Sequence, residues 1–227
     1  MKELASKYDE CEYFALIDGA EKRALIAVGE LEKKYPDSQC ALEYKEDPFR
    51  LLVMARLSAQ CTDKRVNEVS VPLFRRFPDA FSMADAPLPE LEELVRPCGV
   101  YRVKAKNIKD MSAMLVKDHG GKVPRDRDYL LTLPGVGRKI ANLIMGDVFG
   151  DPGIVADTHC IRFANRMGVC HSDSPLTVET VLDGLIPPEK QSDFCHRAVQ
   201  FGRDVCTSRN PDCDGCPIRK AILERNR

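Results

Sequence analysis

Apolar side chains follow a helical spacing along almost the whole chain of 227 residues. They recur three and four positions apart, which places them on one face of an α-helix. Sustained alternation of apolar and polar residues, the mark of a half-buried strand, is hard to find. The pattern therefore predicts an all-α protein. Two clear runs are Phe49, Leu52, Val53 and Leu57, and Ile108, Met111, Met114 and Leu115.

Clusters of proline, glycine and aspartate interrupt this pattern and predict where helices end. They cut the chain into about ten helices of ordinary length. The absence of a fixed repeat or a low-complexity tract argues against a solenoid and against a long flexible linker. Residues 1–23 form a weakly patterned extension to which we assign no function. The interruptions are Tyr35-Pro36-Asp37, Asp47-Pro48, Phe77-Pro78-Asp79, Gly120-Gly121, Leu133-Pro134-Gly135, Gly150-Asp151-Pro152-Gly153 and Pro187-Pro188.

The overall charge gives no case for a nucleic-acid partner, because the formal net charge is only -1. One stretch of the chain nevertheless contains five basic residues and no acidic one. Charge of this density can neutralise several phosphates, or it can be an ordinary solvated helix face. The five residues are Arg96, Arg102, Lys104, Lys106 and Lys109.

The N-terminal sequence MKELASKYDECEYF mixes acids with bases and leads into no uninterrupted apolar run. It resembles neither a signal peptide nor a membrane span, so we expect a soluble protein in the cytoplasm. Disulfides rarely persist there, and a cluster among the ten cysteines is better explained by a metal or by burial.

Residues 133–139, Leu-Pro-Gly-Val-Gly-Arg-Lys, place two glycines just before an apolar helical run. Gly135 and Gly137 allow close backbone approach, and the free amides of the new helix can hold a phosphate oxygen. These features describe a helix-hairpin-helix motif that grips one DNA strand, although a plain helix-capping turn uses the same residues. Lys139 lies in the first turn beside Arg138, and the helix end and that cation both disfavour its charged form. An amine nucleophile needs the neutral form, whereas a lysine that only binds phosphate does not.

Asp157 follows a turn and precedes another helical run, so it is well placed as an N-cap. A cap alone would explain an aspartate at this position. On the helix that follows, we expect His159 to be a core histidine and Arg162 a surface arginine.

Four motifs in order resemble the endonuclease III family of helix-hairpin-helix DNA glycosylases. They are LSAQCTD at 57–63, CGVYRVKAKNI at 98–108, LPGVGRKIAN at 133–142 and VADTH at 155–159, with Asp157 eighteen residues after Lys139. The resemblance covers roughly residues 24–216. It implies a two-lobed all-α fold, with a six-helix barrel at residues 41–151 and a second lobe from residues 24–40 and 152–227. DNA would lie between the lobes.

The resemblance also implies a bifunctional DNA glycosylase and abasic-site lyase, with Lys139 as the Schiff-base lysine and Asp157 as the essential aspartate. Gln60 would fill the space left by the extruded nucleotide, and Val100 would wedge between bases. Without the resemblance, Gln60 reads as a buried helix-end amide and Val100 as a core contact. The implied partner is double-stranded DNA with damaged bases, most simply oxidised pyrimidines, bound by a monomer without a nucleotide cofactor. The runner-up is a non-catalytic helix-hairpin-helix module that only binds DNA.

The family's cysteine loop is incomplete in this sequence. Cys206, Cys213 and Cys216 match the first three ligands of a [4Fe-4S] cluster, but Ile222 stands where the fourth cysteine is expected. Four thiolates normally hold such a cluster. Three alternatives stay open: a cluster with another fourth ligand, a zinc site completed by His196 or another cysteine, and a loop without metal.

Overall fold

The computed structural model describes residue 8 and residues 10–225. Part of the N-terminal extension, residues 1–7 and 9, lies outside the described residues. In this described part there are twelve α-helices, three short 3-10 helices and no strand, which confirms the predicted all-α class. None of these helices is both long and apolar enough to cross a membrane.

The chain divides into two compact units. The central unit comprises Cys40–Phe149, and the terminal unit comprises the described residues before Cys40 together with the described residues from Gly150 onward. Each unit encloses its own cluster of buried apolar side chains. The two units therefore have separate cores, one built from a continuous segment and the other from both ends of the chain.

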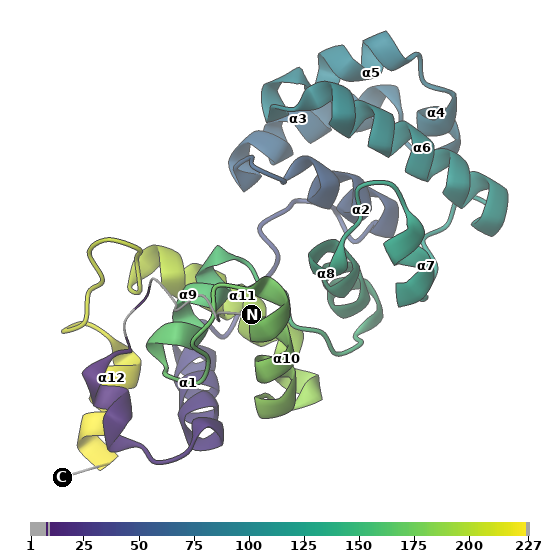
Figure 1. Ribbon diagram of the computed structural model, residues 1–227. Helices are drawn as coiled ribbons and strands as arrows, with labels where there is room; N and C mark the ends of the chain where they lie inside the picture. The colour runs from purple at the N-terminus through teal and green to yellow at the C-terminus, as the bar shows by residue number, and fades with distance from the viewer. Residues whose placement is uncertain (1–7, 9, 226–227) are drawn as a thin grey trace. The chain divides into compact units, whose positions relative to one another are not determined.

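The central unit consists of helices α2 to α8 (Figure 1), which surround a core rich in leucine, valine and alanine. The resemblance predicts a six-helix barrel at residues 41–151, whereas this unit spans Cys40–Phe149 and contains seven α-helices. Helix α6 is the longest, and α4 and α5 pack against it. The bounds are α2 Pro48–Leu57, α3 Asp63–Arg76, α4 Ala80–Asp85, α5 Leu88–Val95, η2 Arg96–Cys98, α6 Tyr101–His119, α7 Arg127–Thr132 and α8 Arg138–Phe149.

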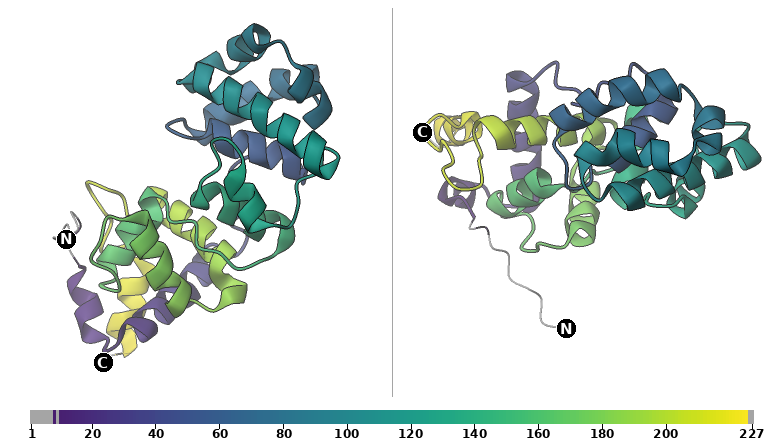
Figure 2. Two further views of the ribbon diagram at one scale, coloured as in Figure 1. Left: turned by 45° about the vertical axis from the view of Figure 1, so that its right-hand side comes forward. Right: turned by 90° about the horizontal axis from the view of Figure 1, so that it is seen from above.

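In the terminal unit, segments from the two ends of the chain lie side by side. Helix α12 packs against both α1 and η1, and α1 also contacts α10 and α11 (Figure 2). The described part of the extension is therefore packed structure. The bounds are η1 Glu12–Leu16, α1 Ala20–Lys34, α9 Thr158–Arg166, α10 Pro175–Leu185, η3 Pro188–Lys190, α11 Gln191–Asp204 and α12 Pro217–Arg225.

The turn signals in the sequence mark real helix ends. Asp47 caps α2 by accepting hydrogen bonds from the amides of Phe49 and Arg50, and Pro48 occupies the first helical position. Gly120 ends α6 in the left-handed conformation, at φ 59°. Proline, glycine and aspartate thus begin or end these helices for the local conformational reasons on which the predictions were based.

Candidate active site and cysteine loop

The hairpin predicted from residues 133–139 joins α7 to α8. Val136 is buried, and its amide donates to the carbonyl of Leu133 at 3.0 Å. Gly135 has φ 78°, and a Cβ there would come within 2.3 Å of Nε of Arg56 and 2.6 Å of Nδ2 of Asn107. A side chain at Gly135 is therefore disfavoured both by the backbone conformation and by the neighbouring side chains.

The start of α8 is the exposed side of the hairpin. Gly137, Arg138 and Lys139 are all exposed, and the carbonyl of Gly137 accepts the first bonds of the helix from Ile140 and Ala141 at 3.0 Å. A Cβ added at Gly137 would meet nothing within 4 Å. The first turn is therefore exposed and carries cationic side chains, features that helix N-termini use for binding phosphate.

Gln60 and Val100 share an unusual backbone conformation. Both are exposed and both are left-handed, at φ 55° and φ 47°. This conformation is rare for a residue with a side chain, and for β-branched valine it is a true outlier. Val100, 58% exposed, makes no core contact, and Gln60 is not buried. The two plain interpretations given to these residues are therefore wrong, and local strain of this kind gathers at functional sites.

Lys104 holds together the segments that carry these two residues. It is only 1% exposed, and its Nζ donates to the carbonyl oxygens of Leu57 at 2.8 Å and Cys98 at 2.7 Å. Burial lowers the pKa of Lys104. Sequence reasoning missed this role because a lysine between exposed bases gives no sign of burial.

The basic patch is accordingly smaller than predicted. Lys104 is buried and cannot contact phosphate, so the predicted patch of five basic residues was wrong in this member. Lys109 donates to the carbonyl of Ala86 at 2.6 Å, and Lys106 pairs with Asp110 at 2.5 Å. Two further lysines of the patch are thus bound by protein groups, Lys109 by a carbonyl oxygen and Lys106 by a carboxylate.

Asp157 is the N-cap of α9, as its position predicted. Its Oδ1 accepts from the amides of His159 at 2.9 Å and Cys160 at 2.8 Å. Both cap bonds use Oδ1, so Oδ2 takes no part in them. A cap of this kind fixes the carboxylate at the helix end, which suits a catalytic group as well as a structural one.

Two arginines on α9 reach the cysteine loop, residues 206–216. Arg162 is 4% exposed, and its Nε donates to the carbonyl of Cys206 at 2.9 Å. The expectation of a surface arginine at this position was therefore wrong, because the loop folds over it. Arg166 donates to the carbonyls of Thr207 at 2.8 Å and Ser208 at 3.2 Å. The helix that begins at Asp157 is thereby bound to the loop.

The three loop cysteines differ in exposure. Cys206 and Cys216 are buried and Cys213 is exposed, and all ten cysteines of the chain are free thiols. In the described part of the chain, no three histidine, cysteine or acidic side chains are gathered as metal ligands. Burial raises the pKa of Cys206, and the hydrogen bond from Arg166 opposes that rise. Ile222, at the family's fourth position, is 0% exposed in the core of the terminal unit.

One further cysteine belongs to this region. Cys11 lines the same small pocket as the three loop cysteines, and burial raises its pKa to about 11. Only the packing of the N-terminal segment against the loop reveals it, since 195 residues separate Cys11 from Cys206. The sequence contained one signal for such a cysteine, because the loop has only three cysteines and the chain has seven more.

Comparison with known proteins identifies the family of the chain. Residues 53–188 match the model of the HhH-GPD superfamily of base excision DNA repair proteins. The endonuclease III of Bacillus subtilis is 42% identical over 204 residues, which is 89% of this chain and 93% of that protein.

Two solved structures are similar over most of their length. A trapped covalent intermediate of endonuclease III with DNA, described as an estranged-adenine complex, is 42% identical with a TM-score of 0.83, covering 91% of this chain and 99% of that one. A non-covalent endonuclease III–DNA complex is 41% identical with the same TM-score, covering 91% and 98%. The chain therefore belongs to the endonuclease III family, within the HhH-GPD superfamily of base excision DNA repair proteins.

Proposed function

We propose that Lys139 and Asp157 carry out the reaction of this base excision repair enzyme, a DNA glycosylase with abasic-site lyase activity. The observation that carries the proposal is the exposed amine of Lys139 in the first turn of α8, directly after the hairpin. The endonuclease III of the first solved structure, 42% identical to this chain, was trapped as a covalent intermediate with DNA. A nucleophile at the position of Lys139 would explain such an intermediate.

In the proposed reaction the damaged base leaves the stack, and the neutral amine of Lys139 attacks C1′ of its sugar. The bond from nitrogen to C1′ forms as the bond to the base breaks, and the base departs with the electron pair and takes a proton from water. Asp157 stabilises the positive charge that develops on the sugar and accepts the proton released by the amine. The sugar ring then opens as the bond from C1′ to O4′ breaks, and O4′ takes the proton held by Asp157. The resulting protonated imine makes the C2′ proton acidic, and loss of that proton expels the 3′ phosphate. Water then releases Lys139 from the cleaved strand.

The DNA contacts in this proposal come from the hairpin and from two loops of the central unit. Backbone amides at Gly135 and Gly137, with Arg138, hold phosphates without reading sequence. Gln60 and Val100 occupy the space that the extruded nucleotide leaves, which offsets a few kcal/mol of unstacking cost by order of magnitude. Their exposed side chains on a strained backbone support this role.

We assign the enzyme to oxidised pyrimidines in double-stranded DNA, acting as a cytoplasmic monomer associated with the nucleoid. Support comes from Lys139, since the resemblance associates excision of mismatched adenine with relatives that lack this lysine. Duplexes carrying one oxidised pyrimidine should be cleaved faster than duplexes with mismatched adenine. The opposite preference would contradict the substrate assignment.

We also propose that the cysteine loop holds an iron–sulfur cluster. The donor chemistry fits, because Cys206, Cys213 and Cys216 are free thiols, as thiolate ligation requires. Sγ of Cys206 lies 3.0 Å from Nη1 of Arg166, and a guanidinium can only donate, so this sulfur already acts as an acceptor. When bound, the cluster would crosslink the loop and supply no step of the lyase reaction.

Borohydride trapping tests the catalytic assignment. With an abasic-site duplex, the intact protein should form a covalent adduct, and Lys139→Ala should abolish it. Lys117→Ala is the matched control, because Lys117 is an exposed lysine near the end of α6 and should leave the adduct unchanged. Failure of the intact protein to form any adduct would favour the non-catalytic DNA-binding module.

A further inference from the structure

Four cysteines from opposite ends of the chain line one pocket. Cys206, Cys213 and Cys216 come from the loop, and Cys11 comes from the segment before η1. The remaining lining includes Tyr13 and Arg166. The loop lacks the fourth thiol of its family, and the pocket provides one from elsewhere in the sequence.

Arg166 connects Cys11 to the loop. The amide of Cys11 donates to the carbonyl of Arg166 at 2.9 Å, while Nη1 of Arg166 lies 3.0 Å from Sγ of Cys206. The same residue at the end of α9 therefore fixes the backbone of one cysteine and contacts the sulfur of another. This places Cys11 by a specific bond and not by loose packing.

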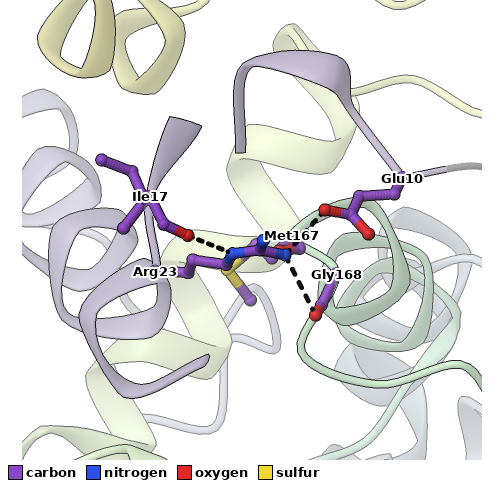
Figure 3. Close-up of polar contacts among 5 residues, drawn as sticks. All are labelled: Glu10, Ile17, Arg23, Met167 and Gly168. Atoms are coloured by element: carbon purple, nitrogen blue, oxygen red, sulfur yellow. Dashed lines mark hydrogen bonds and ion pairs between the residues drawn. The ribbon is translucent and has the colours of Figure 1, made fainter. Parts of the chain in front are cut away.

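A second anchor lies just beyond the end of α9 (Figure 3). Arg23 donates through Nη1 to Oε1 of Glu10 at 2.6 Å and to the carbonyl of Gly168 at 3.3 Å, and through Nε to the carbonyl of Ile17 at 2.8 Å. Gly168 has φ 65°, and a Cβ there would come within 2.3 Å of the Glu10 carboxyl carbon. Contacts on both sides of Cys11 thus hold the segment against the end of α9.

We propose that Cys11 supplies the fourth thiolate of the iron–sulfur cluster held by Cys206, Cys213 and Cys216. Ile222 cannot ligate iron, and its side chain is enclosed in the apolar core. Four free thiols around one pocket match the ligand set of a [4Fe-4S] cluster. Cluster binding converts them to thiolates and releases four protons to solvent. The thiols are not gathered as metal ligands in the structure, so cluster binding requires them to turn toward a common centre. Cys216 would then give up the contact of its Sγ with the phenol oxygen of Tyr13, at 3.6 Å.

This inference rests on the proposal that the loop binds a cluster and is independent of the chemistry of Lys139. The intact protein, purified without oxygen and reconstituted with iron and sulfide, should contain about four iron atoms per chain and absorb visible light. Cys11→Ala should lower iron to about three atoms or fewer and, after oxidation with ferricyanide, produce the electron paramagnetic resonance signal of an oxidised three-iron cluster. Cys213→Ala should behave likewise. Cys170→Ala, a buried cysteine of the same unit outside the pocket, should retain wild-type iron.

The possible results of these measurements distinguish the presence of the cluster from the role of Cys11 as its fourth ligand. Zinc in place of iron, or no metal in the intact protein, would overturn the cluster and Cys11 with it. A folded Cys11→Ala protein with unchanged iron and spectrum would overturn the role of Cys11 alone. If the variant does not fold, alkylation of the intact protein decides: Cys11 should be protected until a chelator removes iron. Equal labelling of Cys11 before and after iron removal would exclude it as a ligand.

Discussion

The ammonium nitrogen of Lys104 lies 2.7 Å from the carbonyl oxygen of Cys98, two residues before Val100. The same nitrogen donates to the carbonyl of Leu57, three residues before Gln60. A single buried cation therefore bonds to both segments that carry the proposed DNA-inserting residues. It acts as a positioning residue, because neither its charge nor its amine reaches the surface.

Lys104→Met should keep the volume of the side chain and remove both hydrogen bonds. We expect a loss of about 1–3 kcal/mol in unfolding free energy, because two backbone carbonyls lose their partner. Lesion binding should weaken as well, whereas the Lys139 adduct should still form at saturating DNA. Denaturant unfolding and a DNA titration measure the two effects.

Lys106→Met is the matched control on the same helix. Lys106 makes only an exposed ion pair with Asp110, so its removal should change stability by at most about 1 kcal/mol. Equal destabilisation by the two substitutions would contradict the special role of Lys104.

The two hairpin glycines should respond differently to alanine. Gly135→Ala places a Cβ against Arg56 in a left-handed conformation, and should cost about 1–3 kcal/mol of stability. Gly137→Ala meets no protein atom, so stability should hardly change, while affinity for an abasic duplex should fall because the methyl group faces the phosphate. Thermal unfolding and DNA binding of both variants give the comparison. Unchanged affinity in Gly137→Ala would place the phosphate elsewhere.

Gly202 on α11 gives a test of the contact between α9 and its neighbours. A Cβ there would lie 2.4 Å from Nδ1 of His159 and 2.7 Å from Nη2 of Arg162. Gly202→Ala should therefore destabilise the protein by about 1–3 kcal/mol and lower its melting temperature. Gly184→Ala is the control, because Gly184 is an exposed residue of α10 and nothing lies within 4 Å of an added Cβ. Alanine there should stabilise the protein by up to about 1 kcal/mol.

The sequence predicted what depends on local chemistry. Asp47, Asp157 and Gly120 end or begin helices through bonds and backbone angles that neighbouring residues determine. The hairpin before Lys139 belongs to the same class. The residues that carry these features were correctly placed because no distant contact was needed.

The features that were missed depend on contacts between distant segments. Lys104 can be buried because carbonyl oxygens 6 and 47 residues away accept hydrogen bonds from its Nζ. Arg162 is buried because the loop 44 residues later covers it. Cys11 joins the loop only through the packing of the chain's two ends. No local pattern distinguishes these side chains from ordinary surface or core residues.

His159 should make the terminal unit sensitive to acid. Burial is the main cause that lowers its pKa below the ordinary value of 6.5, with Arg162 and Arg203 adding to the effect, while Asp157 and the backbone of Gly202 oppose it. Nη2 of Arg162 lies 3.1 Å from Nδ1, and a guanidinium can only donate, so the ring is neutral with Nδ1 as acceptor. Protonation of Nδ1 would place an N–H donor of His159 opposite an N–H donor of Arg162.

Because the folded pKa is lowered, the unfolded state binds more protons once the pH falls below about 6.5. The stability that neutral His159 contributes is therefore complete above that pH and is lost as the pH falls through the folded value. His159→Gln removes this proton, and should flatten the pH dependence of the unfolding free energy by at most about 1.4 kcal/mol per pH unit. His171→Gln is the control, since His171 is exposed. Parallel curves for the wild type and His159→Gln between pH 7 and about 5 would show that His159 is not the group responsible.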